Sequence, residues 1–180
     1  MRWPCPVCVC LSFAVLAAGC ASPKIGYDYD RSARFTDYRT YEWGPDAPHT
    51  VGDRRIDNRL LDAHIRSAIV DELHSKGFTT SGQGLPDFYV AYHAGVKDLM
   101  KGSSTQNYIG DRAHGTYTTI SDIQPYSEGT LLIDVVDAAS KKLVWQASAI
   151  TEVDTGMDAE ERDRRIRRIV RAMLAPFPPH

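Results

Sequence analysis

The cysteine thiols are the first candidates for chemistry in this 180-residue chain, and all four lie near its start. They are Cys5, Cys8, Cys10 and Cys20. The first three could hold a metal ion, but they lack a fourth ligand and lie in an apolar segment, so we expect no metal site. Cys20 differs because it directly follows the small residues 17–19. A short apolar stretch over 7–18, behind the single basic residue Arg2, completes the pattern of a secretory signal.

A cysteine directly after small residues resembles a lipobox, where bacterial lipoproteins receive a diacylglyceryl group on sulfur before the signal peptide is removed. We therefore predict a lipoprotein signal peptide over 1–19, lipidation of Cys20 and a lipidated tether over 20–24. Two or three acyl chains such as palmitate would hold the protein to a leaflet without a spanning helix. Ala21, in place of aspartate, favours the outer membrane and a position facing the periplasm. Ordinary secretion without a lipid is the alternative.

The composition is that of an ordinary folded domain and excludes some classes of protein. Hydrophobic residues make up 43% of the chain and charged residues 24%, and 21 basic residues stand against 23 acidic ones. Because nucleic-acid binding domains are usually clearly basic, we expect no nucleic acid as a partner. No apolar run reaches about 18 residues, so the sequence predicts no membrane-spanning helix. We predict one domain over 25–180.

Few other side chains suggest catalysis. Asp28 and Asp30 lie two apart on a predicted strand and could in principle act as paired carboxylates or bind a cation, but polar positions on an exposed face or strand end are the explanation we favour. His93 could be a base or a ligand, although a single strand histidine is more often structural. The motifs of a nucleophile elbow, a phosphate loop and a zinc protease do not occur. We therefore expect no catalytic residue, cofactor or metal site.

The elements that would position these groups follow from hydrophobic spacing. Apolar residues recur at helical intervals over 57–76 and 159–174, and the second helix has a capping-box spacing from Asp158 to Glu161. A loop is expected over 46–52, which contains Pro48. Strand patterns cover 25–30, 38–43, 78–80, 88–96, 130–136 and 143–150. Together they predict an α+β fold, with a mainly antiparallel sheet of five or six strands and two helices packed on one face.

A basic face on the second helix is one candidate interaction surface. At 100° per residue, four arginines fall within roughly 100° of one another and form one outward stripe. They are Arg164, Arg167, Arg168 and Arg171. Such a stripe could contact anionic lipid headgroups or phosphorylated sugars. The alternative, which we favour, is a solvated face, because acidic residues four positions earlier can pair with Arg164 and Arg167.

The segment 98–127 is the other candidate surface. It is rich in Gly, Ser, Thr and Tyr and poor in aliphatic residues, which predicts a long mobile excursion or, alternatively, an open hairpin through Tyr108 and Tyr117. Tyrosine gives a large contact area with a polar end at low entropic cost. We therefore include Tyr108 and Tyr117 in the possible interaction surface.

A series of short motifs, in order and spacing, resembles a known bacterial family. They are Tyr27-Asp28-Tyr29-Asp30, Thr40-Tyr41-Glu42-Trp43, Ile65-Arg66-Ser67-Ala68-Ile69, Gly77-Phe78, Pro86-Asp87-Phe88-Tyr89, Glu128-Gly129-Thr130-Leu131, Leu143-Val144-Trp145 and Pro176-Phe177-Pro178-Pro179. The family is that of the envelope lipoproteins with a domain of unknown function of the DUF4136 type. The resemblance implies a lipid-anchored α+β domain of the cell envelope, without an established activity.

These observations predict a bacterial envelope lipoprotein that acts as a non-catalytic binding or interaction module. Its expected partners are the membrane, through the N-terminal lipid, and an envelope protein, lipid or glycan. A carrier of a small apolar ligand is the alternative, and it would require an apolar pocket of a few hundred cubic ångströms. An envelope hydrolase is less favoured, and it would require His93 to meet Asp28 or Asp134 in a cleft.

Overall fold

The computed structural model describes residues 22–44, 49–50, 59–82, 84–109, 116–154 and 156–179. This part of the chain contains two α-helices, one short 3-10 helix and seven strands. The helices are α1 (Arg59–Ser75) and α2 (Ala159–Leu174), and the 3-10 helix spans Phe35–Asp37. The strands are β1 (Lys24–Tyr29), β2 (Thr40–Trp43), β3 (His49–Thr50), β4 (Thr79–Thr80), β5 (Phe88–Ile109), β6 (Thr116–Asp137) and β7 (Leu143–Glu152).

All seven strands belong to one sheet. The strands β1, β7, β6 and β5 lie side by side in antiparallel pairs, whereas β2 and β3 pair with β5 in parallel and β4 extends the sheet from β2. The predicted α+β fold is confirmed, with a mixed sheet of seven strands where five or six were expected. The additional strand is β3, which lies in the predicted loop over 46–52 and is too short to show an alternating pattern.

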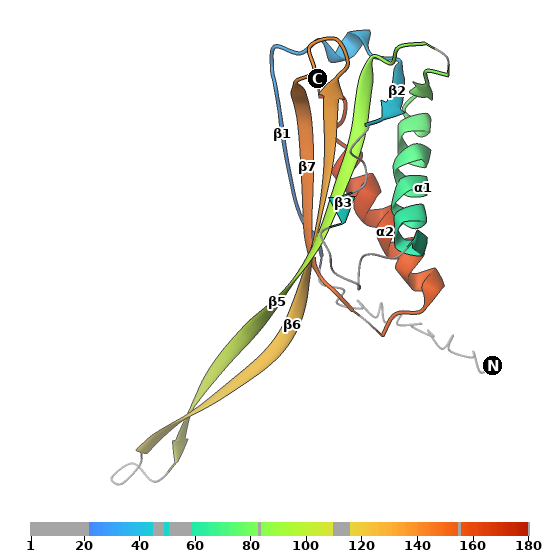
Figure 1. Ribbon diagram of the computed structural model, residues 1–180. Coiled ribbons are helices and arrows are strands. Elements are labelled where there is room, and N and C mark those ends of the chain that lie inside the picture. Colours follow the sequence, from blue (N-terminus) through green and yellow to red (C-terminus); the bar gives the residue numbers. More distant parts are fainter. Residues whose placement is uncertain are drawn as a thin grey trace, which may run out of the picture.

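Both helices lie on the same face of the sheet, as predicted (Figure 1). Four apolar residues of α1 are buried, at the spacing of one helical face: Ile65, Ala68, Ile69 and Leu73. The helix ends before Gly77, whose φ of +89° is readily adopted only by glycine. No helix in the described part of the chain is long and apolar enough to cross a bilayer.

The second helix begins where the sequence predicts. The side chain of Asp158 accepts a hydrogen bond from the Glu161 backbone N–H, with Oδ1 and N 2.8 Å apart, which satisfies one of the donors at the helix start. Its buried residues face the sheet and include Ile169, Val170 and Met173. The apolar stripe that the sequence predicts for this helix is therefore confirmed.

Aromatic rings from distant parts of the chain meet in the core between the helices and the sheet. The ring of Phe177, which is 1% exposed, lies 5.1 Å from that of Trp145 and 5.7 Å from that of Phe88, measured between centroids. Phe78 lies 5.5 Å from the same ring. Separations in this range suit offset and edge-to-face packing. The closing Pro-Phe-Pro-Pro motif is thus part of the core.

A carboxylate joins the start of β5 to the start of β2. Asp87 Oδ2 accepts hydrogen bonds from the backbone N–H groups of Arg39 and Thr40, each at 2.8 Å, and from Thr40 Oγ1 at 3.0 Å. Burial alone would raise the pKa of Asp87, but these donors outweigh it and hold the pKa below its ordinary value. The parallel pairing of β2 with β5 is therefore fixed by a charged group as well as by the backbone.

Candidate functional site

A two-stranded extension of the sheet is the most prominent feature outside the core. The strands β5 and β6 pair continuously from Phe88 opposite Asp137 to Ile109 opposite Thr116. The neighbouring strands end much earlier, since β7 pairs with β6 only as far as Glu128 and β3 pairs with β5 only as far as Ala94. We call residues 99–109 and 116–126 the arm, and at about 3.4 Å per residue it is roughly 35 Å long. It projects well beyond the helices (Figure 1).

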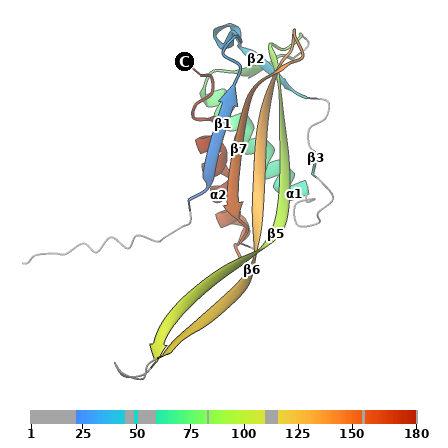
Figure 2. The same cartoon turned by 90° about the vertical axis from the view of Figure 1, so that its left-hand side faces the viewer.

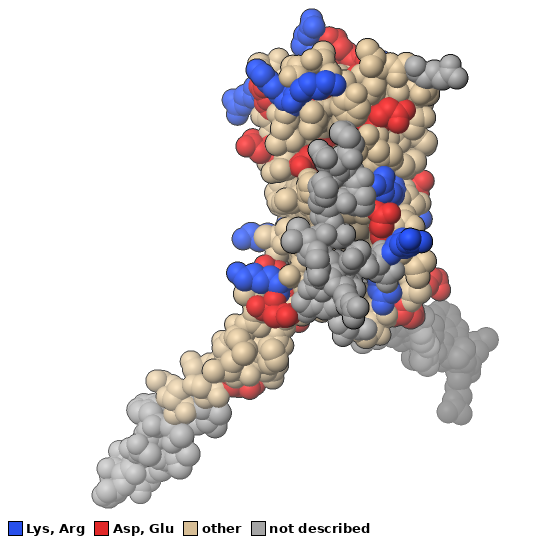
Figure 3. Space-filling model, viewed as in Figure 1, with Lys and Arg blue, Asp and Glu red and all other residues tan. Residues whose placement is uncertain are grey.

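The two faces of the arm differ in chemistry. On one face, Met100 lies opposite Pro125 and Gly102 opposite Ile123; on the other, Lys101 lies opposite Gln124. Met100 is 73% exposed and Ile123 is 65% exposed, so this face presents apolar side chains to solvent. Lys101 and Asp122 are the only Lys, Arg, Asp or Glu residues of the arm, and both lie on the opposite face. The charges of the arm therefore cancel, and Figure 3 shows it as largely uncharged.

The predictions for 98–127 distinguished a mobile excursion from a hairpin, and the described backbone of this segment forms the hairpin. Tyr108 and Tyr117 are direct partners in its register, so the structure brings the two positions together near the end of the arm. Their side chains lie outside the described part of the structure. Cys20, the predicted lipidation site, also lies outside the described residues, and the described chain begins two residues after it.

Glycine marks the point where the arm leaves the body of the sheet. Gly129 of β6 lies opposite Val96 of β5, and Gly95 lies opposite Thr130. The backbone N–H of Val153 donates to the carbonyl of Ser127 at 2.8 Å, which places the chain after β7 directly against this root. Glycine in a strand commonly marks a bend or a close approach of another chain segment.

The arginines predicted as one outward stripe on α2 are divided by their contacts. Arg167 pairs with Asp71 of α1 and with Asp163, and Arg171 pairs with Glu72 of α1 at 2.8 Å. Arg164 pairs with Glu160. The hydrogen bond from Arg167 lowers the pKa of Asp163 and outweighs the opposing effect of desolvation. Both i,i+4 pairs of the solvated-face alternative therefore form, and two arginines serve the contact between the helices.

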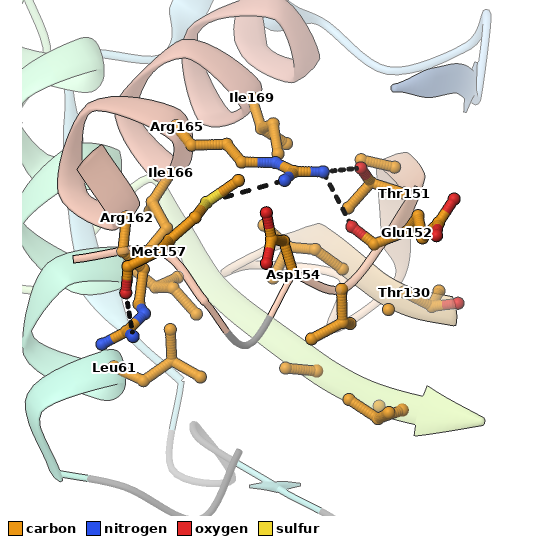
Figure 4. A pocket seen from close by; sticks show the side chains of 18 residues that line it. Leu61, Thr130, Thr151, Glu152, Asp154, Met157, Arg162, Arg165, Ile166 and Ile169 are labelled. Atoms are coloured by element: carbon orange, nitrogen blue, oxygen red, sulfur yellow. Dashed lines mark hydrogen bonds between the residues drawn. The ribbon is translucent and has the colours of Figure 1, made fainter. Parts of the chain in front are cut away.

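A groove that the sequence did not reveal lies at the N-terminal end of α2 (Figure 4). Its volume is about 190 Å³, and its apolar lining includes Leu61 of α1, Val96 of β5 and Ile166 of α2. Met157 closes one side, and Arg165 crosses the groove to donate to Thr151 Oγ1 at 2.6 Å and to the Glu152 carbonyl at 2.7 Å. The lining includes residues of α1, α2 and three strands, β5, β6 and β7, so no sequence motif could have indicated the groove.

A second hollow of about 580 Å³ adjoins this groove and shares Met157 and Arg165 with it. Pro23, Arg164 and Arg168 also line it. The start of the described chain therefore lies beside the arginines of α2. The remaining arginine of the predicted stripe, Arg168, is placed at this hollow and not at the contact with α1.

Of the residues considered for hydrolysis, His93 contacts Asp134 but not Asp28. His93 Nε2 lies 3.4 Å from Asp134 Oδ2, and Gln146 Nε2 donates to Asp134 Oδ1 at 2.7 Å. These three residues, His93, Asp134 and Gln146, lie on the sheet face opposite the helices and line neither of the two hollows. Asp28 is the register partner of Gln146, which places it two strands from Asp134. Asp30 instead accepts hydrogen bonds from Ser32, and these bonds lower its pKa.

Most of the chain matches one protein-family model. A model described as "Domain of unknown function (DUF4136)" matches residues 25–179. The search of curated proteins found no match.

The search of solved structures found matches at low sequence identity. The crystal structure of a PDZ domain protein from Parabacteroides distasonis is 14% identical with a TM-score of 0.52, and the match covers 87% of this chain. This chain spans only 35% of that protein. The PelC dodecamer from Paraburkholderia phytofirmans, in two crystal forms, is 8% identical with a TM-score of 0.48 in each case. Those matches cover 86% of this chain and 96% and 97% of PelC.

Proposed function

The chain belongs to the DUF4136 family, and from this premise we propose that it is a lipid-anchored lipoprotein of the bacterial cell envelope. Its folded domain is a binding module without catalytic activity, and the arm is its binding element. Cys20 carries the lipid, and Ala21 after it favours the outer membrane, facing the periplasm. The partner is another component of the envelope: a protein, a lipid or a glycan.

The observation that carries this proposal is the isolation of the arm from the rest of the sheet. Among the described residues, no third strand pairs with 99–109 or with 116–126. A two-stranded ribbon is only marginally stable in water, and its outer edges offer backbone N–H and C=O groups to a further molecule. Such a ribbon is better explained by a contact that it makes than by a role in supporting the core.

A binding role also agrees with the contacts of the other candidate groups. Arg167 and Arg171 are used between the helices, and the pair of His93 and Asp134 lies outside both hollows. A general base acts on a substrate held against it, so a pair on a broad sheet face is poorly placed for catalysis.

Photo-crosslinking in the native envelope tests the proposed binding element. A photoreactive amino acid is placed at Ser104 in the arm and, as the control, at Ala139 in the turn between β6 and β7. Both positions are exposed, and they lie at opposite ends of the sheet. We expect adducts with an envelope component from position 104 and few from position 139. Equal yields at the two positions would contradict the assignment of the arm.

A carrier of a small apolar ligand is a second candidate, and the groove beside Arg165 favours it. Its volume of about 190 Å³ lies below the usual range for ligand pockets, roughly 300–1,000 Å³, which would limit the cargo to a small or single-chain molecule. Native mass spectrometry of the protein purified from its own envelope tests this function. A stoichiometric apolar molecule would support the carrier, whereas ligand-free protein would argue against it.

A further inference from the structure

The described chain begins at the same end of the sheet from which the arm leaves the body of the protein. Lys24, the first residue of β1, lies opposite Ile150 of β7. Ile150 in turn lies opposite Thr130 of β6, which lies opposite Gly95 of β5. One row across four strands thus contains both the start of the folded chain and the root of the arm. Figure 2 shows β1 beginning at the end of the sheet from which β5 and β6 continue.

The tether is much shorter than the arm. Three residues stand between Cys20 and Lys24, and the four Cα–Cα steps from one to the other span at most about 14 Å. The arm extends roughly 35 Å from the same row. When Cys20 is held in a leaflet, an arm that points toward that leaflet is longer than the space that the tether leaves between the body and the lipid.

We propose that the arm lies along the headgroup region of the leaflet that holds Cys20, with its Met100 and Ile123 face toward the lipid. This inference rests on the proposed lipid anchor and names the lipid surface as the partner of the arm. The protein then has two points of attachment to the membrane, which fix its orientation. A single flexible anchor would leave the body free to rotate.

The chemistry of the arm suits the headgroup region and not the hydrocarbon core. Open strand edges carry unpaired backbone groups, which are not tolerated in hydrocarbon but are satisfied by water and headgroups. Exposed Met100 and Ile123 gain from contact with the acyl boundary, while Lys101 and Asp122 on the opposite face remain in water. Because these two charges cancel, the contact is expected to depend little on salt or on anionic lipid.

Fluorescence quenching in vesicles tests this orientation. The lipidated protein offers no other thiol once 1–19 is removed and Cys20 is acylated, so a single introduced cysteine can be labelled. The label, the fluorophore NBD, is placed at Ser104→Cys or at Ala139→Cys, and the full lipidated protein is reconstituted in phosphatidylcholine vesicles containing nitroxide-labelled lipid. We expect quenching at least threefold stronger at position 104 than at position 139. The double substitution Met100→Ser and Ile123→Ser should reduce the quenching at 104 without releasing the protein from vesicles.

The possible outcomes separate the two proposals. Protein that fails to float with the vesicles contradicts the lipid anchor itself. Protein that floats but shows equally weak quenching at both positions overturns the orientation of the arm and leaves the anchor intact. Excimer fluorescence from pyrene at position 104, without quenching by lipid, would show that a second copy occupies the arm, and it would also overturn the inference.

Discussion

Val153 lies so close to Gly129 that a Cβ atom at position 129 would stand 2.9 Å from Val153 Cγ2. The strand β6 and the chain that follows β7 therefore meet at the root of the arm at a distance that only glycine allows. Because the β-branched side chain of Val153 has few favourable rotamers, a larger residue at position 129 forces either that side chain or the backbone to shift.

Gly129→Ala should therefore destabilise the domain by roughly 1–3 kcal/mol, as expected for overpacking at a closed contact. Urea unfolding followed by circular dichroism measures the difference. Gly95→Ala is the matched control, since it also lies at the root of the arm and a Cβ there meets no atom within 4 Å. Equal stability of the two variants would show that the contact between Gly129 and Val153 is not tight in solution.

The closing motif of the chain should contribute strongly to stability through Phe177. Replacing this ring by alanine leaves a cavity against Trp145 and Phe88, and we expect a loss of about 3–5 kcal/mol in the free energy of unfolding. Leu85→Ala is the control because Leu85 is 91% exposed. A melting temperature for Phe177→Ala that equals that of the control would place the tail outside the core.

Asp87→Asn should lower stability at neutral pH by about 1–2 kcal/mol, because the hydrogen bonds from Arg39 and Thr40 lose their charged acceptor. The lowered pKa of Asp87 means that the ionised carboxyl stabilises the fold fully above its unfolded-state pKa, near 3.8. That contribution is lost as the pH falls through the lowered pKa of the folded state. The gap in unfolding free energy between wild type and variant should therefore close in acid.

Denaturant unfolding at pH 7 and at pH values below 3.8 measures this gap. Asp28→Asn is the control, since the carboxylate of Asp28 accepts a hydrogen bond from the backbone N–H of the adjacent Tyr29 and joins no separate strands. A gap for Asp87→Asn that persists unchanged in acid would mean that shape, and not charge, is what the site requires.

The helix contact should depend only modestly on its ion pairs. The side chain of Arg167 is 41% exposed, so Arg167→Ala is expected to cost at most about 1 kcal/mol, and the cost should fall at high salt. Arg168→Ala should leave stability unchanged because it removes no ion pair of the described residues. Thermal melts of both variants at two salt concentrations measure these costs. A cost of several kcal/mol for Arg167→Ala would contradict the prediction and indicate a buried network of ion pairs.

Much of the fold follows from the sequence because it depends on local spacing. The buried positions of α1, from Ile65 to Leu73, recur at helical intervals, and Asp158 carries its own capping signal. The strand β3 did not follow, because two residues such as His49 and Thr50 cannot display a period. The hairpin of the arm was predicted only as an alternative to a mobile excursion, because the many Ser and Thr residues of this segment do not alternate regularly with apolar residues.

The candidate site was less accessible to sequence reasoning because it depends on contacts between distant segments. Angles on a helical wheel place Arg167 and Arg171 on an outward face, but they do not show that α1 presents Asp71 and Glu72 to them. The groove is formed by segments far apart in the chain, and its apolar lining residues resemble ordinary core residues. Met100 and Ile123 become a shared face only when the register of the hairpin is known.

The most direct test of the central proposal, a lipid on Cys20, is metabolic labelling of cells with radioactive palmitate. We expect label in the wild-type protein and in Cys10→Ser, whose substitution lies in the predicted signal peptide, and a complete loss of label in Cys20→Ser. The unlabelled variant should also leave the membrane fraction. Undiminished label and membrane association in Cys20→Ser would contradict the proposal.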